Sequence, residues 1–174
     1  MTDRSLPKPP KETTVRQAAL AGALLIFIDA FWFNQGVIAG LLGAGLVLVG
    51  LPLALFRKPH PIRAQRLRNL SIYAVSVILV FALNALNNRV AASRAEVVIA
   101  AVKAFHGKNG RYPESLNDLT PEFLDHIPLA KYTLGQNTFY YHVTEGRAVL
   151  FYVKFPPFGR PIYRFADDKW GYID

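Results

Sequence analysis

Histidine and carboxylate side chains are the groups of this chain best suited to acid–base or metal chemistry. Histidine occurs four times, at His60, His106, His126 and His142, and no pair has the spacing typical of metal ligands. The 174-residue chain contains no cysteine, which excludes disulfides, thiolate metal sites and cysteine catalysis. We therefore expect neither a bound metal nor any other cofactor.

Two pairs of neighbouring groups could serve as a general acid and base, namely Glu114 with Asp118 and Asp125 with His126. The simpler interpretation is that these are exposed charges on short helices. The sequence also has no glycine-rich loop of the kind that binds phosphates. We therefore expect that the protein is not an enzyme.

Another acid, Asp29, lies within a long apolar run. An acid inside a membrane segment is expensive to bury and is a functional candidate. Alternatively, Asp29 lies close enough to a helix end for its carboxylate to reach lipid headgroups or bond to a neighbouring helix. The sequence favours this second interpretation.

The formal net charge of +8 is concentrated beside apolar segments. Residues 1–17 carry a net charge of +2 and residues 57–69 carry +5, whereas the much longer stretch 89–174 carries only +2. Lysine and arginine beside apolar segments set the orientation of a membrane protein. We therefore expect the partner of these charges to be a lipid bilayer and not nucleic acid.

Apolar residues make up 52% of the chain, and their excess precedes residue 90. As one helix, residues 18–56 would be about 58 Å long, roughly twice the 30 Å of a hydrocarbon core. We therefore predict a transmembrane helical hairpin that turns at Asn34-Gln35-Gly36, where polar residues meet a glycine. A third span is predicted over residues 70–88.

The charges also predict which side of the membrane each part occupies. Two spans separate the tail, residues 1–17, from the loop, residues 57–69, so tail and loop share one side. Both are basic, and basic segments stay in the cytoplasm. The third span then carries residues 89–174 to the outside.

Small residues mark a candidate helix–helix interface. Gly36 and Gly40 lie four residues apart on one helix face, which allows another helix to approach closely. Asp29 lies near this face and belongs to the same candidate interface. The face either packs within the hairpin or binds a helix of another membrane protein.

One continuous helix is predicted from Arg63 to His106, because these 44 residues contain no glycine or proline although the chain has 12 of each. Gly107 is its predicted end. An apolar stripe at i, i+4 and i+7 runs along its second half and is typical of a domain core. The stripe consists of Val98, Val102 and Phe105, with Val97 and Ala101 beside them.

From residue 131 onward the apolar pattern has a period of two, which predicts strands over residues 138–143, 148–155, 161–165 and 169–173. Glu145-Gly146 is a predicted hairpin turn, and Thr120-Pro121-Glu122 is predicted to begin a short helix. The predicted fold class is therefore an α+β membrane protein. An N-terminal helical hairpin precedes one long helix, whose amphipathic half is packed by a small antiparallel β-sheet.

The connection between helix and sheet has a recognisable order: Gly110-Arg-Tyr-Pro-Glu-Ser-Leu-Asn-Asp-Leu119, then Pro121-Glu-Phe-Leu124, then Ile127-Pro128. From about Leu70 to Asp174 the chain resembles the pilins and pseudopilins of type IV pili and type II secretion, and in particular the major pseudopilin group. The resemblance implies a pilin-like periplasmic domain on a bacterial inner membrane. Its structural motif comprises Gly110, Tyr112, Pro113, Leu116, Leu119, Pro121, Ile127 and Pro128.

Two features differ from a processed pilin. The third span begins Asn69-Leu-Ser-Ile-Tyr-Ala74, without the glycine and the glutamate of a prepilin cleavage site, and a two-span hairpin precedes it. We therefore expect a pilin-like domain that stays in the membrane. Some pseudopilins bind calcium in this half of the fold, which makes Asp167-Asp168 a candidate, although a turn before a strand is the simpler interpretation.

These observations predict a non-enzymatic assembly or accessory component of an envelope complex related to pili or secretion. Its partners would be other membrane or envelope proteins. The alternative is a membrane-tethered periplasmic ligand-binding module that uses its aromatic-rich sheet, and an exposed aromatic cluster on the sheet face away from the helix would favour it. Half of the aromatic residues should face the helix; they are Phe139, Tyr140, Tyr141, Phe151, Tyr152, Tyr163, Phe165, Trp170 and Tyr172.

Overall fold

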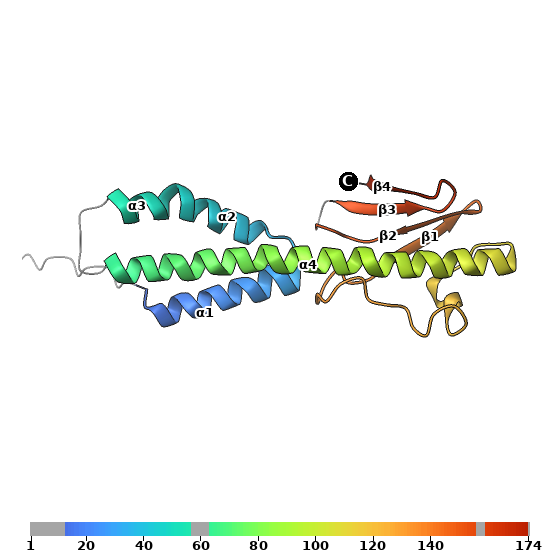
Figure 1. Ribbon diagram of the computed structural model, residues 1–174, viewed down its shortest axis with the longest axis horizontal. Coiled ribbons are helices and arrows are strands. Elements are labelled where there is room, and N and C mark those ends of the chain that lie inside the picture. The colour runs from blue at the N-terminus through green and yellow to red at the C-terminus, as the bar shows by residue number, and fades with distance from the viewer. Residues whose placement is uncertain (1–12, 57–62, 156–158, 174) are drawn as a thin grey trace, which may run out of the picture.

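The computed structural model describes residues 13–56, 63–155 and 159–173. One helix, α4 (Arg63–Asn109), runs along the molecule, and the other elements lie beside it (Figure 1). Apolar helices accompany its first half, and a four-stranded antiparallel sheet accompanies its second half. The predicted α+β class is therefore confirmed.

The first apolar run forms α1 (Val15–Ile26), which continues directly into the π-helical segment η1 (Phe27–Phe33). A capping box between Thr14 and Gln17 begins α1. After η1 the chain turns at Asn34 and Gly36, which both adopt the left-handed conformation. The predicted break between the two apolar helices is therefore confirmed.

The second apolar run consists of α2 (Val37–Gly45), the π-helical segment η2 (Leu46–Gly50) and α3 (Leu51–Phe56). Pro52 follows the widened turns of η2, and a proline disturbs the helix before it because it has no N–H to donate and its ring crowds the carbonyl four residues earlier. In the widened turn, the N–H of Leu51 donates to the carbonyl of Leu46, five residues back.

The two apolar runs do not pair with each other as a simple hairpin. A tight turn joins them, but α1 and α2 each make their main contact with α4, which runs between them in Figure 1. Gly22 shows how closely α1 approaches, because a Cβ there would lie 2.4 Å from Oγ of Ser76. The predicted hairpin thus consists of two helical arms, α1 with η1 and α2 with η2 and α3, which pack mainly against α4.

Within the described part of the chain, three stretches are long and apolar enough to cross a membrane: Val15–Phe33, Val37–Phe56 and Arg63–Asn109. Their outward side chains are apolar and largely exposed, as at Leu41, Leu48 and Ile78. A large exposed apolar surface of this kind is what helices in lipid present to their surroundings.

α4 begins at Arg63 as predicted but ends at Asn109, three residues beyond the predicted end at His106. Gly107 lies inside the helix, where a glycine costs only about 1 kcal/mol. The helix ends instead at Gly110, which has a φ of +69° and donates its N–H to the carbonyl of His106 at 2.8 Å.

The apolar stripe on the second half of α4 forms the core of the sheet domain, by which we mean residues 89–155 and 159–173. Val98 and Val102 are fully buried, and Ala91, Ala95 and Ile99 extend the stripe. Val97 is 52% exposed, so its expected place beside the stripe was wrong. Successive helical residues are rotated by about 100°, which turns Val97 away from the sheet.

The sheet contains β1 (Tyr140–Thr144), β2 (Arg147–Phe151), β3 (Arg160–Arg164) and β4 (Lys169–Ile173) in the order β1-β2-β3-β4. All four predicted strands are confirmed, and Glu145-Gly146 forms the β1–β2 turn with positive φ at both residues. β2 ends at Phe151, four residues before its predicted end.

The segment between α4 and β1 contains one short helical turn, η3 (Leu116–Leu119). The helix predicted to begin at Thr120-Pro121-Glu122 is absent, and residues 121–123 form a turn. The hydroxyl of Thr120 donates to the carbonyl of Asn117 at 2.9 Å, so it caps no following helix.

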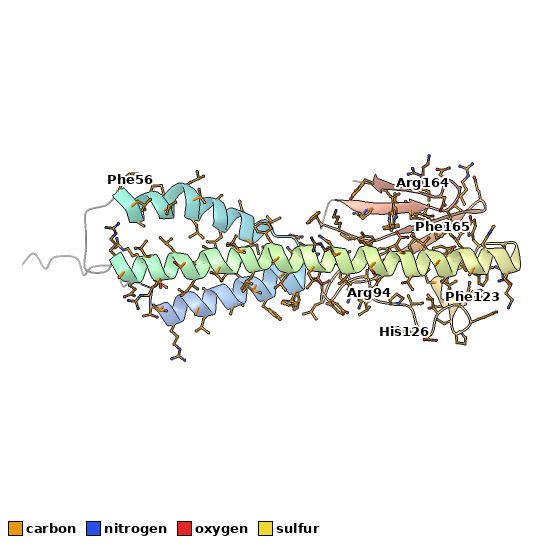
Figure 2. All side chains as sticks on the ribbon, in the orientation of Figure 1. Phe56, Arg94, Phe123, His126, Arg164 and Phe165 are labelled. Carbon is orange, nitrogen blue, oxygen red and sulfur yellow. The ribbon has the colours of Figure 1, made fainter. Side chains whose placement is uncertain are left out.

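Polar contacts attach both sides of the sheet domain to α4. On the sheet side, Glu96 accepts a hydrogen bond from Nε1 of Trp170 at 3.1 Å. On the side of the connecting segment, Arg94 donates from Nη1 to the carbonyl of Leu129 at 2.8 Å. Figure 2 shows Phe165 on the first side and Arg94 on the second. The second half of α4 is therefore enclosed from two directions.

Candidate functional site at the junction of the helices and the sheet domain

The turn between α1 and α2 meets the sheet domain near the middle of α4 (Figure 1). The N–H of Leu134 donates to the carbonyl of Phe31 at 2.8 Å, and the N–H of Tyr132 donates to Oδ1 of Asn87 at 3.3 Å. The loop of residues 130–137 is thus bonded both to η1 and to α4. We call this region the junction.

Asp29 is fully buried beside the junction and caps the following helix. Its Oδ1 accepts the N–H of Gly36 at 2.8 Å, and its Oδ2 accepts the N–H of Ala39 at 2.7 Å. These N–H groups belong to the start of α2, where the helix dipole favours a negative charge. The geometry therefore supports the interpretation in which Asp29 bonds to a neighbouring helix.

Gly36 and Gly40 face α4. A Cβ on Gly36 would lie 3.0 Å from Cε1 of Phe81, and a Cβ on Gly40 would lie 3.9 Å from its Cζ. The candidate helix–helix interface is therefore used within the chain, and the helix that it meets is α4 and not α1.

Four asparagines that were not among the predicted site residues fill the junction. Asn34 comes from the α1–α2 turn, whereas Asn84, Asn87 and Asn88 come from α4, and all four are buried. Within the described residues, neither amide atom of Asn34 or of Asn84 has a hydrogen-bond partner. Buried amides of this kind are commonly satisfied by ordered water, because an unpaired one costs about 1–3 kcal/mol.

A signal for this cluster was present in the sequence. Asn84, Asn87 and Asn88 have i, i+3 and i+4 spacing, which places them on one face of a helix. A polar face on an otherwise apolar helix indicates a packed and not a lipid-facing surface. Asn34, in contrast, shows its role only once the turn is seen against α4.

Lys131 is a buried cation on the sheet-domain side of the junction. Its Nζ donates to the carbonyl of Lys154 at 2.9 Å. Burial, with a smaller contribution from the nearby charge of Lys154, lowers the pKa of Lys131 from 10.5 to about 8. Burying the charged ammonium group of Lys131 therefore lowers the stability of the folded protein.

This lowered pKa predicts how stability depends on pH. Above about pH 8 the folded protein releases the proton of Lys131, whereas the unfolded chain keeps it up to its pKa of 10.5, so the free energy of unfolding should rise with pH. Lys131→Met should abolish this rise, which amounts to at most about 3 kcal/mol. Denaturant titrations of both proteins in detergent from neutral pH to pH 10 would measure it, and parallel curves would contradict the assignment.

Buried tyrosines act in the opposite direction and set the upper limit of this pH range. Burial raises the pKa of Tyr152 to about 12 and also raises that of Tyr141 from the ordinary value of 10.0. Above about pH 10 the unfolded chain loses these protons before the folded protein does, so the free energy of unfolding falls as the pH rises further. Both proteins contain the two tyrosines, and their difference therefore isolates Lys131.

The motif residues identified from the sequence come together around the far half of α4. Leu119 and Pro113 are fully buried, and Tyr112 and Leu116 pack against the core. The hydroxyl of Tyr141 donates to the carbonyl of Pro113 at 3.1 Å. Leu116, Ile127 and Pro128 line an open pocket of about 430 Å³, Gly110 ends α4, and Pro121 lies exposed in the following turn.

The acid–base candidates are engaged structurally or lie exposed. The N–H of Ser115 donates to Oδ2 of Asp118 at 3.0 Å and lowers the pKa of that carboxyl, and the N–H of Glu114 donates to the same oxygen at 2.8 Å. Asp118 therefore caps η3 instead of forming an acid–base pair. Asp125 and His126 are both exposed.

The remaining histidines have separate environments. His106 stacks on the ring of Tyr112 with 4.2 Å between centroids, and His142 is exposed on the sheet. His60 lies outside the described residues. Within residues 13–56, 63–155 and 159–173, no group of three or more histidine, aspartate or glutamate side chains is arranged to hold a metal ion.

Asp167 and Asp168 lie in the β3–β4 turn, as the simpler interpretation predicted. Asp168 pairs with Lys103 and accepts a hydrogen bond from the hydroxyl of Tyr163, while Asp167 pairs with Arg164 at 3.2 Å. Both carboxylates are thus engaged with cations of the protein, which disfavours a role in binding calcium.

The aromatic residues of the sheet divide between its two faces. Phe139, Tyr152, Tyr163 and Phe165 are buried against α4, and Tyr141 packs beside them. On the opposite face, Tyr140 and Phe151 stack across β1 and β2 with 4.9 Å between ring centroids. Among the described residues, the outer face therefore offers one aromatic pair and not an extended aromatic surface.

Comparison with known proteins identified no relationship: no protein-family model matches the chain, and neither does a characterised protein or a solved structure.

Proposed function

We propose that this chain is a non-enzymatic component of a bacterial envelope complex that is anchored in the inner membrane and presents a pilin-like domain in the periplasm. Its role is assembly or support of a machine related to pili or secretion. The observation that carries the proposal is the continuity of α4, which belongs to the apolar helices at one end and to the core of the sheet domain at the other.

Rigid presentation follows from this continuity and from the junction. A helix of 47 residues is about 70 Å long, and the loop of residues 130–137 is bonded both to η1 and to α4. The sheet domain therefore has a fixed height and orientation relative to the apolar helices. Such geometry suits a subunit that must meet its partners in a defined register.

The positions of the acid–base candidates support the non-enzymatic part of the proposal. Asp118 caps a helical turn, and Asp125 and His126 are both exposed. General acid–base catalysis would instead require two titratable groups held together in a pocket.

Orientation is the first testable part of the proposal. Because the wild type has no cysteine, single cysteines can be introduced without background labelling. A cysteine at Gln65, in the basic region before the third span, should resist a membrane-impermeant maleimide in spheroplasts, and one at the exposed Asn117 should react. The reverse pattern would contradict the proposed topology, and permeabilised cells supply the control for reactivity at Gln65.

Partner contact is the second part, and photocrosslinking in growing cells tests it. A benzophenone amino acid at the exposed Leu129 or Tyr172 of the sheet domain should give discrete products with envelope proteins of a pilus or secretion system. The same probe at the buried Val98 is the matched control and should give none. If the exposed positions gave no protein product, the assembly role would be contradicted.

Ligand binding by the sheet is the second candidate function, and the stacked pair Tyr140–Phe151 is the observation that favours it. One such pair covers far less surface than the extended aromatic platform that ligand binding by the sheet would need. The assembly role is therefore the better supported of the two.

A further inference from the structure

A pocket of about 390 Å³ lies at the junction, between the α1–α2 turn and the sheet domain. Three separate parts of the chain line it: Trp32, Phe33 and Gln35 from the turn, Gly135 and Gln136 from the loop, and Val153 and Arg160 from the sheet. The hydrogen bond between Leu134 and Phe31 holds the turn and the loop together beside it. We call this hollow the junction pocket.

The polar side chains that line the junction pocket all carry donors, and among the described residues its lining contains no acid. Arg160 has an exposed side chain with no hydrogen bond or ion pair to any described residue. Oε1 of Gln136 accepts the hydroxyl of Tyr140 at 3.2 Å, which leaves the amide NH₂ of Gln136 to donate elsewhere. Gln35 adds a second amide. A guanidinium beside amide donors is suited to a phosphate group.

Its other walls are apolar and face outward. Trp32 is 53% exposed and Phe33 is 44% exposed, and they are the last two residues of the apolar helical segment η1. Aromatic side chains at the end of a membrane-spanning helix lie at the level of the lipid headgroups. A molecule in this pocket would therefore meet donors on the sheet-domain side and aromatic rings on the side of the hydrocarbon core.

We propose that the junction pocket binds the headgroup of an anionic phospholipid, with the phosphate on Arg160 and the amides and the glycerol and upper acyl chains along Trp32 and Phe33. This inference rests on the proposed placement of the apolar helices in a membrane, but it does not depend on which side the sheet domain faces. A bound headgroup would connect the turn to the sheet domain and so strengthen the junction.

Native mass spectrometry of the full chain, released from nanodiscs of phosphatidylcholine and phosphatidylglycerol, tests the proposal. The wild type should retain one phosphatidylglycerol in preference to phosphatidylcholine. Arg160→Gln should reduce this retention by roughly tenfold, the loss expected for one charge-assisted contact. Because Arg160 is exposed, the variant should keep the wild-type circular dichroism and melting temperature.

Arg147→Gln is the matched control, because Arg147 is also an exposed strand arginine but lies beside the β1–β2 turn, away from the junction pocket. It should retain lipid as the wild type does. Equal losses in both variants would show non-specific attraction by a basic surface and overturn the proposal. Titration of the phosphatidylglycerol-bound protein with inorganic phosphate separates the two sources of phosphate, and displacement of the lipid by millimolar phosphate would overturn the assignment to a lipid.

Failure of the proposed function has a different signature. If the chain does not enter nanodiscs at all, its placement in a membrane is wrong. If it enters them but shows no preference for phosphatidylglycerol, only the junction-pocket proposal is wrong.

Discussion

Replacing Leu119 by alanine should lower the free energy of unfolding of the sheet domain by about 2–5 kcal/mol. Leu119 is fully buried in the core that α4 shares with the sheet. Its carbonyl also accepts the N–H groups of Phe123 and Leu124 at 2.8 and 3.0 Å, which fixes the backbone around it. The surrounding chain therefore has little freedom to collapse into the space that the substitution leaves.

Leu116→Ala is the matched control for this prediction. Leu116 begins the same helical turn and packs against the same core, but it is only half-buried and also lines the open pocket of the motif segment. It should lose clearly less stability than Leu119→Ala, because less apolar surface is buried there. Guanidinium titrations of the full chain in detergent, followed by tryptophan fluorescence in a Trp32→Phe background that leaves Trp170 as the reporter, would measure both. Equal losses would contradict the packing described here.

The fold could be predicted from the sequence where periodicity and turn chemistry agreed. The long helix was predicted from 44 residues without glycine or proline. The strands were predicted from apolar residues at every second position, in segments separated by turns such as Glu145-Gly146. Errors arose where a side chain that is typical of a helix start forms a different hydrogen bond in the structure. Thr120 looked like a helix cap, but its hydroxyl donates backward to the carbonyl of Asn117.

The junction was harder to predict, because its residues act on partners distant in sequence. The spacing of Asn84, Asn87 and Asn88 marks a polar face on α4, but no periodicity shows that Asn34 lies buried at the same place. The junction pocket is a similar case, since its lining runs from Trp32 to Arg160. Such sites depend on how the helical arms pack against α4, and local sequence patterns do not predict that packing.

The connection between the two helical arms depends on the carboxylate of Asp29. Asp29→Ala should remove both hydrogen bonds from the start of α2 and leave the N–H groups of Gly36 and Ala39 buried without partners. Hydrogen bonds to charged groups contribute about 1.5–3 kcal/mol each, and unpaired buried donors add to the loss. We therefore expect the free energy of unfolding of the apolar helices to fall by at least about 3 kcal/mol in steric-trapping measurements in bicelles. The sheet domain should keep its fold.

Two further variants separate the carboxylate from the size of the side chain. Asp29→Asn keeps one acceptor but turns an amide NH₂ toward the second N–H, so it should recover only part of the loss. Asn84→Ala truncates an equally buried side chain whose amide atoms have no partner among the described residues, and should cost much less. If Asp29→Ala and Asn84→Ala destabilised the helices equally, Asp29 would be filling space and not capping α2. The predicted order is instead Asp29→Ala, Asp29→Asn and Asn84→Ala, because the cap depends on two oxygen acceptors that carry a negative charge at the positive end of a helix.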